Sequence, residues 1–171
     1  MNSVQFSNSS DANGPSRVPE PVGVTVGALA LAAAGWSVAI PVAPLAAPVA
    51  PVATTVLYAI GALLCHQLPE RSFHVDGHQW LVCARCSGLY VGAGLGVVLA
   101  WAYLRRHPSA VWPRPRVLTI LQIVALPTLI TVATAWLGLG DPPNLWRAVL
   151  AVPLGLVAGA VAVALVNDRV K

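Results

Sequence analysis

Charged residues are scarce in this sequence. Only 9% of the 171 residues are charged and 57% are hydrophobic, whereas roughly a quarter of an ordinary soluble domain is charged. This composition excludes an ordinary soluble globule. Ten Lys and Arg against six Asp and Glu give a net charge of +4, which is too sparse for the basic face that nucleic-acid binding needs. We therefore expect a lipid bilayer, and no nucleic acid, as the partner.

Cysteine is also scarce, and several catalytic motifs are missing. Three cysteines are too few for a disulfide scaffold, and their odd number leaves at least one unpaired within the chain. The sequence has no phosphate-binding glycine loop, no Ser-His-Asp order and no H-E-x-x-H motif. The sequence therefore assigns no reaction, and whether the protein is an enzyme stays open.

Long uncharged runs are what the sequence has instead. At 1.5 Å per residue, a helix of about 20 residues crosses a hydrocarbon core of about 30 Å. Four runs approach that length: residues 22–40, 87–104, 117–139 and 148–166. We expect an all-α, polytopic transmembrane bundle of four spans, built as a single domain over residues 21–171. Residues 1–20, rich in Ser, Asn, Gly and Pro, are predicted to form a disordered tail.

A proline-rich segment follows the first run. Pro41, Pro44, Pro48 and Pro51 remove backbone donors and interrupt helix. The thirteen apolar residues of 52–64 are too few to span a bilayer, so they predict a short interfacial or re-entrant helix. A proline-kinked span from about 45 to 64 is the alternative.

Basic residues indicate the orientation in the membrane. The loop 105–116 holds four arginines, and Arg169 and Lys171 lie near the C-terminus. Because short loops rich in Lys and Arg stay in the cytoplasm, we place this loop and the C-terminus there. The span 87–104 then puts segment 65–86 on the extracytoplasmic side of a multi-pass protein of the cell (inner or plasma) membrane.

Glycine spacing predicts how two spans pack. Gly88, Gly92 and Gly96 recur every four residues in the second span, and Gly155 and Gly159 repeat this spacing in the fourth. Small residues on one helix face let two membrane helices approach closely. We therefore expect a tight contact between the second and fourth spans.

Segment 65–86 carries all three cysteines. Cys83 and Cys86 lie three residues apart at the expected start of the second span, near Val82, where one helix face presents both sulfurs. The helix dipole at that end favours thiolate over thiol. Together with Cys65 and one histidine, these residues fit a tetrahedral Cys₃His zinc site, so the sequence predicts a metal-binding site with zinc as cofactor.

The sequence leaves open which histidine is the fourth ligand and whether the thiols bind a metal at all. His66 follows Cys65 directly, and His74 and His78 lie in the same segment. The thiols could instead exchange a disulfide with a quinone, which would make the protein a membrane thiol–disulfide oxidoreductase with Cys65 as the third thiol. In a third hypothesis they form a structural disulfide in a protein that assembles with a membrane-protein partner.

Three short motifs carry a family resemblance. Cys65-His66-Gln67, Arg71-Ser72-Phe73 and Cys83-x-Arg85-Cys86-x-Gly88 resemble a family of small bacterial and archaeal membrane proteins known as a domain of unknown function. The resemblance implies one shared site and favours His66 over the other two histidines. Its implied residues are Cys65, His66, Gln67, Arg71, Cys83, Arg85 and Cys86. Thr131 stands where the family pattern has an acidic residue after Pro127, and the resemblance implies no activity.

Overall fold

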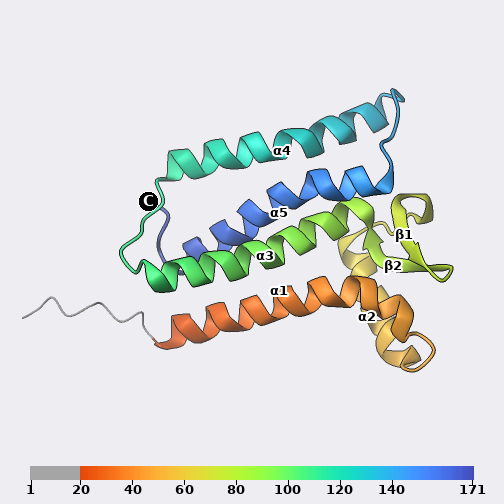
Figure 1. The fold of residues 1–171 in the computed structure, drawn as a ribbon, viewed down its shortest axis with the longest axis horizontal. Coiled ribbons are helices and arrows are strands. Elements are labelled where there is room, and N and C mark those ends of the chain that lie inside the picture. Colours follow the sequence, from red (N-terminus) through yellow and green to blue (C-terminus); the bar gives the residue numbers. More distant parts are fainter. Residues whose placement is uncertain (1–19) are drawn as a thin grey trace, which may run out of the picture.

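A computed structural model describes residues 20–171, which fold mainly into helices (Figure 1). The helices are α1 (Glu20–Ala46), α2 (Pro51–Leu64), α3 (Ala84–Arg106), α4 (Arg114–Trp136) and α5 (Asn144–Val166). All but α2 are long and apolar enough to cross a membrane, which confirms the expected bundle of four apolar helices with one shorter helix. The tail predicted for residues 1–20 lies outside the described residues except for Glu20, where α1 begins.

The first helix is longer than the predicted span 22–40. It continues through Pro41 and Pro44 to Ala46. Ile40 and Ala43 are 0% and 2% exposed, so apolar contacts hold the turn that the prolines weaken. Pro51 then begins α2 at a position where a missing N–H has no effect on helix hydrogen bonding. The prolines therefore shape the connection rather than end α1 at residue 40.

The tight contact predicted between the second and fourth spans is confirmed as the packing of α3 on α5. A Cβ atom placed on Gly88, Gly92 or Gly96 would lie within 3.0 Å of the α5 backbone. The same holds for Gly155 and Gly159 against the α3 backbone. Only glycine allows this approach, so the two helices form the centre of the bundle.

A β-hairpin interrupts the helical pattern and was not predicted from the sequence. After the 3₁₀ turn Pro69–Arg71, strand β1 (Ser72–Val75) pairs antiparallel with β2 (His78–Cys83). Asp76 and Gly77 connect the strands with φ values of 49° and 78°, the positive values that a two-residue type I′ turn requires. Strand β2 leads directly into α3.

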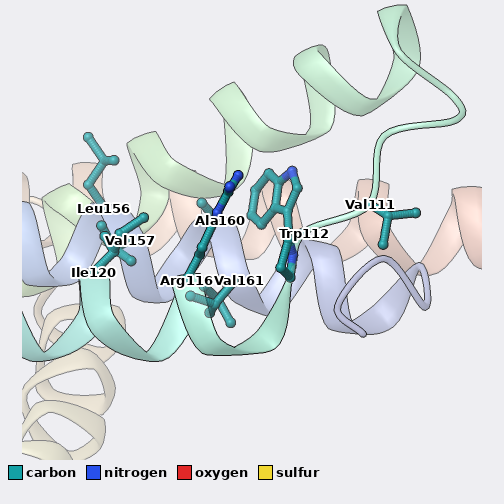
Figure 2. A pocket seen from close by; sticks show the side chains of 10 residues that line it. Val111, Trp112, Arg116, Ile120, Leu156, Val157, Ala160 and Val161 are labelled. Atoms are coloured by element: carbon teal, nitrogen blue, oxygen red, sulfur yellow. The ribbon is translucent and has the colours of Figure 1, made fainter.

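The two ends of the bundle differ in character. Helix α2, the hairpin and the α4–α5 connection lie at one end, and the α3–α4 loop and the C-terminus lie at the other (Figure 1). At the second end the Trp112 backbone N–H donates to Arg169 O at 2.6 Å, and the Lys171 N–H donates to Trp112 O at 3.1 Å. Trp112 is drawn in Figure 2. The arginine-rich loop and the basic C-terminus therefore form one basic end.

Candidate metal centre

The junction between β2 and α3 positions two of the cysteines. Cys83 is the last residue of β2 and caps α3 in an extended conformation (φ −63°, ψ 160°). Helix α3 begins at Ala84, two residues later than Val82, where the sequence suggested that it starts. Cys86 consequently lies in the first turn. Both side chains lie near the helix N-terminus, where the helix dipole favours negative charge.

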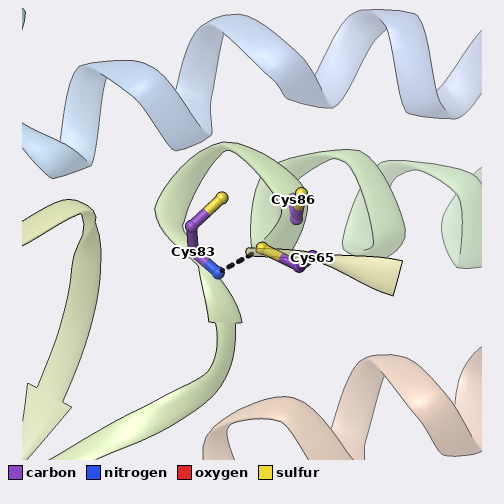
Figure 3. Close-up of side chains that lie close together, drawn as sticks. All are labelled: Cys65, Cys83 and Cys86. Carbon is purple, nitrogen blue, oxygen red and sulfur yellow. Dashed lines mark hydrogen bonds between the residues drawn. The ribbon is translucent and has the colours of Figure 1, made fainter. Parts of the chain in front are cut away.

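The third cysteine ends α2. Cys65 is 8% exposed and extended (φ −153°, ψ 144°), so the chain leaves the helix there. Its Sγ accepts the backbone N–H of Cys83 at 3.3 Å and that of Gln67 at 3.5 Å. These two bonds hold the sulfur beside the start of α3, and Figure 3 shows the one from Cys83.

The three thiols form one group. All three are free, and their Sγ atoms lie within 4.8 Å of one another. In a tetrahedral zinc site with Zn–S bonds of about 2.3 Å, the sulfurs are about 3.8 Å apart. Shifts of about 1 Å or less would bring the three sulfurs to that geometry. The donor set therefore fits a thiophilic metal ion.

Hydrogen bonding favours the thiolate form of Cys83. The side-chain hydrogen bond with Cys86 lowers the pKa of the Cys83 thiol to about 5, against an opposing effect of burial, and bonds with the Cys86 backbone and the Cys65 side chain add to the lowering. A thiolate is the form that binds metals and exchanges disulfides. Cys83 is therefore in its reactive thiolate form at neutral pH.

Gln67 ties the cluster to its surroundings. Its φ is 48°, and its Nε2 donates to Leu81 O at 2.6 Å and to Tyr58 O at 3.1 Å. Gln79 Nε2 in turn donates to Gln67 O at 2.7 Å and to Ser72 Oγ at 3.0 Å. The Tyr58 hydroxyl donates to Gln79 O. The loop after Cys65 is thus fastened to both α2 and the hairpin.

Arg85 lies beside the thiols and contacts α4. Its guanidinium donates to Thr131 Oγ1 at 3.4 Å, and Thr131 is 8% exposed. The Arg85 Nε atom is buried without a hydrogen-bond partner among the described residues. At Thr131, where the resemblance led us to expect an acidic residue, a hydroxyl meets the arginine.

Arg71 belongs to an ion-pair network that the sequence analysis did not assign. Its Nε lies 3.5 Å from Asp141 Oδ2, and the same carboxylate pairs with Arg147, whose side chain is 8% exposed. Arg147 also donates to Asn144 Oδ1 at 3.1 Å, and Asn144 Nδ2 donates to Ser72 O at 2.9 Å. The network fastens the hairpin to the start of α5. No sequence signal links Asp141 to Arg71, since seventy positions separate them.

One cavity of about 430 Å³ brings together all seven site residues that the resemblance implies. It is lined by Cys65, His66, Gln67, Arg71, Cys83, Arg85 and Cys86, together with Leu64, Leu68 and Trp136. Among the described residues, the side chains close enough to one another to share a metal ion are those of the three cysteines, and no histidine is in this group. His66 is exposed at the cavity, whereas His74 and His78 are exposed on the hairpin and are not among its lining residues.

Comparisons with known proteins agree with a membrane protein. The family model described as "Predicted membrane protein (DUF2085)" matches residues 65–161. An uncharacterized protein of Methanocaldococcus jannaschii is 34% identical over 103 residues, which cover 60% of this chain and 61% of the relative, so the chain matches about three fifths of that protein's length. A second uncharacterized protein, from Methanothermobacter thermautotrophicus, is 33% identical over 93 residues, 54% of this chain and 78% of the relative. No solved structure matches the chain significantly.

Proposed function

The chain belongs to the DUF2085 family of membrane proteins, and we propose that its three cysteines bind a Zn²⁺ ion at one end of the helical bundle. The observation that carries this proposal is the convergence of three free Sγ atoms within 4.8 Å of one another. Cys65 comes from the end of α2 and the other two from the start of α3. A group assembled from segments so far apart in the chain favours a shared ligand.

Zinc suits the donors. Thiolates select soft or borderline metals such as Zn²⁺ over Mg²⁺ or Ca²⁺. Three thiolates around a divalent ion leave one net negative charge, and the Arg85 guanidinium lines the same cavity. A cation near the sulfurs offsets that charge and lowers the cost of burying the site.

His66 is the proposed fourth ligand. It follows Cys65 in the chain and, unlike the hairpin histidines His74 and His78, it lines the cavity with the thiols. Because His66 is exposed, its ring can turn toward the sulfurs without leaving a packed position. Four protein ligands would close the coordination sphere, as in structural zinc sites.

The site is proposed to face the extracytoplasmic side. The cluster lies at the end of the bundle opposite the α3–α4 loop and the C-terminus (Figure 1). That other end holds Arg105, Arg106, Arg114, Arg116, Arg169 and Lys171. The positive-inside rule predicts that such an end lies in the cytoplasm. The site would then lie at the extracytoplasmic surface of the cell membrane.

Metal analysis of the purified full-length protein tests the zinc site. We expect about one zinc ion per chain in the wild type, with loss of the ion in Cys83→Ser and weakened binding in His66→Ala. His74→Ala is the matched control, because this histidine lies on the hairpin outside the cavity. Substoichiometric zinc that is unchanged by Cys83→Ser overturns the proposal.

Thiol trapping in intact cells distinguishes the zinc site from the main alternative, a redox function of the thiols. A quinone-coupled oxidoreductase would carry a Cys83–Cys86 disulfide, formed as two electrons and two protons pass to the quinone, and this disulfide would interconvert with the dithiol. The zinc proposal instead expects all three thiols to become alkylated only after a chelator removes the metal. A disulfide that forms and disappears with quinone supply supports the redox function instead.

Labelling with a membrane-impermeant maleimide tests the orientation. Glu70→Cys, at the site end, is expected to react in intact cells, and Ser109→Cys, in the arginine-rich loop, only after permeabilisation. The wild type measures the background from the native cysteines. The reverse pattern would place the site in the cytoplasm and contradict the proposed topology without affecting the metal site.

A further inference from the structure

A second cavity, of about 420 Å³, lies between α4 and α5, away from the cysteines. Apolar side chains from both helices make up most of its lining, among them Ile120, Leu156 and Val157. Trp112 and Arg116 also line it, toward the basic end of the bundle. Figure 2 shows Trp112 on one side of the pocket, Ile120 and Leu156 on the other, and Arg116 between them.

Near the site end, side-chain hydrogen bonds join α4 to the neighbouring helices. There, Thr128 Oγ1 donates to Leu150 O at 3.1 Å, and Arg85 donates to Thr131. Farther along, α5 turns its glycine face, with Gly159, toward α3. The two ribbons diverge toward the basic end (Figure 1), so Ile120 on α4 remains 48% exposed.

Basic residues outnumber acidic ones at the end of the bundle that this groove reaches. The basic end carries five arginines and Lys171, against two acidic residues, Asp168 and Glu20 at the start of α1. Among residues 25–171, whose side chains the structure describes, both salt bridges involve Asp141, at the other end of the bundle. Arg116 therefore has no acidic partner within the described part of the chain, and it stands where the groove meets the basic end.

We propose that this groove binds one anionic phospholipid, with an acyl chain along Ile120, Leu156 and Val157 and the phosphate at Arg116. Apolar walls that end in Trp and Arg match the order of groups in a lipid, because Trp and Arg settle at the headgroup level. Each basic residue near an anionic membrane surface adds attraction for anionic lipid. The lipid comes from the leaflet that contacts the basic end.

The lining of the groove suits a lipid chain. A single acyl chain is narrow enough to lie along the groove, where apolar side chains of both α4 and α5 would contact it. This inference is independent of the proposed zinc site.

Native mass spectrometry on the full-length protein, incubated with equal phosphatidylglycerol and phosphatidylcholine in detergent, tests the proposal. We expect one retained phosphatidylglycerol per chain. Arg116→Gln is expected to reduce the preference for the anionic lipid about fivefold, and Val157→Trp to prevent retention of either lipid by filling the groove. Arg106→Gln, which removes one charge at the same end but outside the groove, is the matched control.

Three results of the lipid measurement would overturn this inference. They are equal retention of both lipids by the wild type, an equal loss of preference in Arg106→Gln and Arg116→Gln, and unchanged retention in Val157→Trp. Circular dichroism and size-exclusion chromatography check that each variant is folded. If Val157→Trp misfolds, Ile120→Phe fills the same groove from α4. A dimer in the wild type that Val157→Trp converts to a monomer would identify a second copy of the chain as the occupant instead.

Discussion

The Sγ atom of Cys65 accepts a hydrogen bond from the backbone N–H of Cys83 at 3.3 Å. This bond joins the end of α2 to the residue that caps α3, across 18 positions of sequence. Because the acceptor is the sulfur itself, the atom proposed to bind zinc also fixes the relative position of the two segments. The metal-free protein is therefore expected to hold its thiols close together.

Alkylation of the metal-free protein measures the thiolate at Cys83. The hydrogen bond with Cys86 lowers the pKa of the Cys83 thiol to about 5, so its reaction rate with iodoacetamide should level off above about pH 6. An ordinary thiol keeps gaining rate up to about pH 8.5. Cys86→Ala removes the hydrogen-bond donor and should move the inflection toward the ordinary value. The inflection is read from mass spectrometry of the Cys83 peptide.

The lowered pKa of Cys83 should also make the stability of the folded protein fall as the pH drops. A thiol whose pKa is lower in the folded than in the unfolded state stabilises the folded protein fully above the unfolded pKa of about 8.5. That contribution falls as the pH drops toward 5. Cys83→Ser should flatten this part of the stability profile of the metal-free protein. A Cys83 inflection near pH 8.5 that Cys86→Ala leaves unchanged would contradict the prediction.

Replacing Gln67 by alanine should loosen the site without removing a thiol. The carbonyls of Leu81 and Tyr58 would lose the amide that donates to them, and an unpartnered buried polar group costs about 1–3 kcal/mol. We expect a lower free energy of unfolding and weaker zinc binding, measured by thermal unfolding and by competition with a chelator. Gln122→Ala, an exposed amide on α4, is the matched control, and equal losses in both variants would argue against this role.

The helices could be predicted from sequence because each long uncharged run has to satisfy its own backbone hydrogen bonds in a bilayer. The α3–α5 contact could be predicted because glycines such as Gly92 and Gly155 mark faces of close approach. The convergence of the thiols followed from the spacing of Cys83 and Cys86 together with the resemblance of the segment around Cys65.

The hairpin escaped prediction although its turn carries a signal. Asp76-Gly77 is a typical type I′ pair, yet β1 is only four residues long, too few for its polar–apolar alternation to identify a strand, and β2 ends in an unbroken apolar run. Its position also depends on Asn144, which donates to Ser72 O from the start of α5. The pairing of Asp141 with Arg71 likewise depends on tertiary structure, which a linear sequence pattern does not encode.

Asp141 is expected to contribute more to stability than its exposed partner Arg71 does. Asp141→Asn leaves the guanidinium of Arg147, 8% exposed, without its carboxylate. Breaking a buried pair costs about 3–5 kcal/mol, and because Asp141 itself is 29% exposed, we expect a loss near the lower value. Arg71→Gln should change stability by less than about 1 kcal/mol, because its side chain is 40% exposed and exposed pairs contribute little. Chemical denaturation in detergent would contradict the prediction if the two variants lost equal stability.

A pair of glycine substitutions tests the central helix contact. A Cβ at Gly92 would overlap the Val152 carbonyl of α5, whereas nothing lies within 4 Å of one at Gly35 in α1. Gly92→Ala should therefore force α3 and α5 apart and lower the free energy of unfolding by about 1–3 kcal/mol. This loss should outweigh the higher helix propensity of alanine. Gly35→Ala meets no atom and should be neutral or stabilising by up to about 1 kcal/mol. Thermal unfolding in the same detergent compares the two variants, and a Gly92→Ala protein as stable as the wild type would show that α3 and α5 are not packed backbone to backbone.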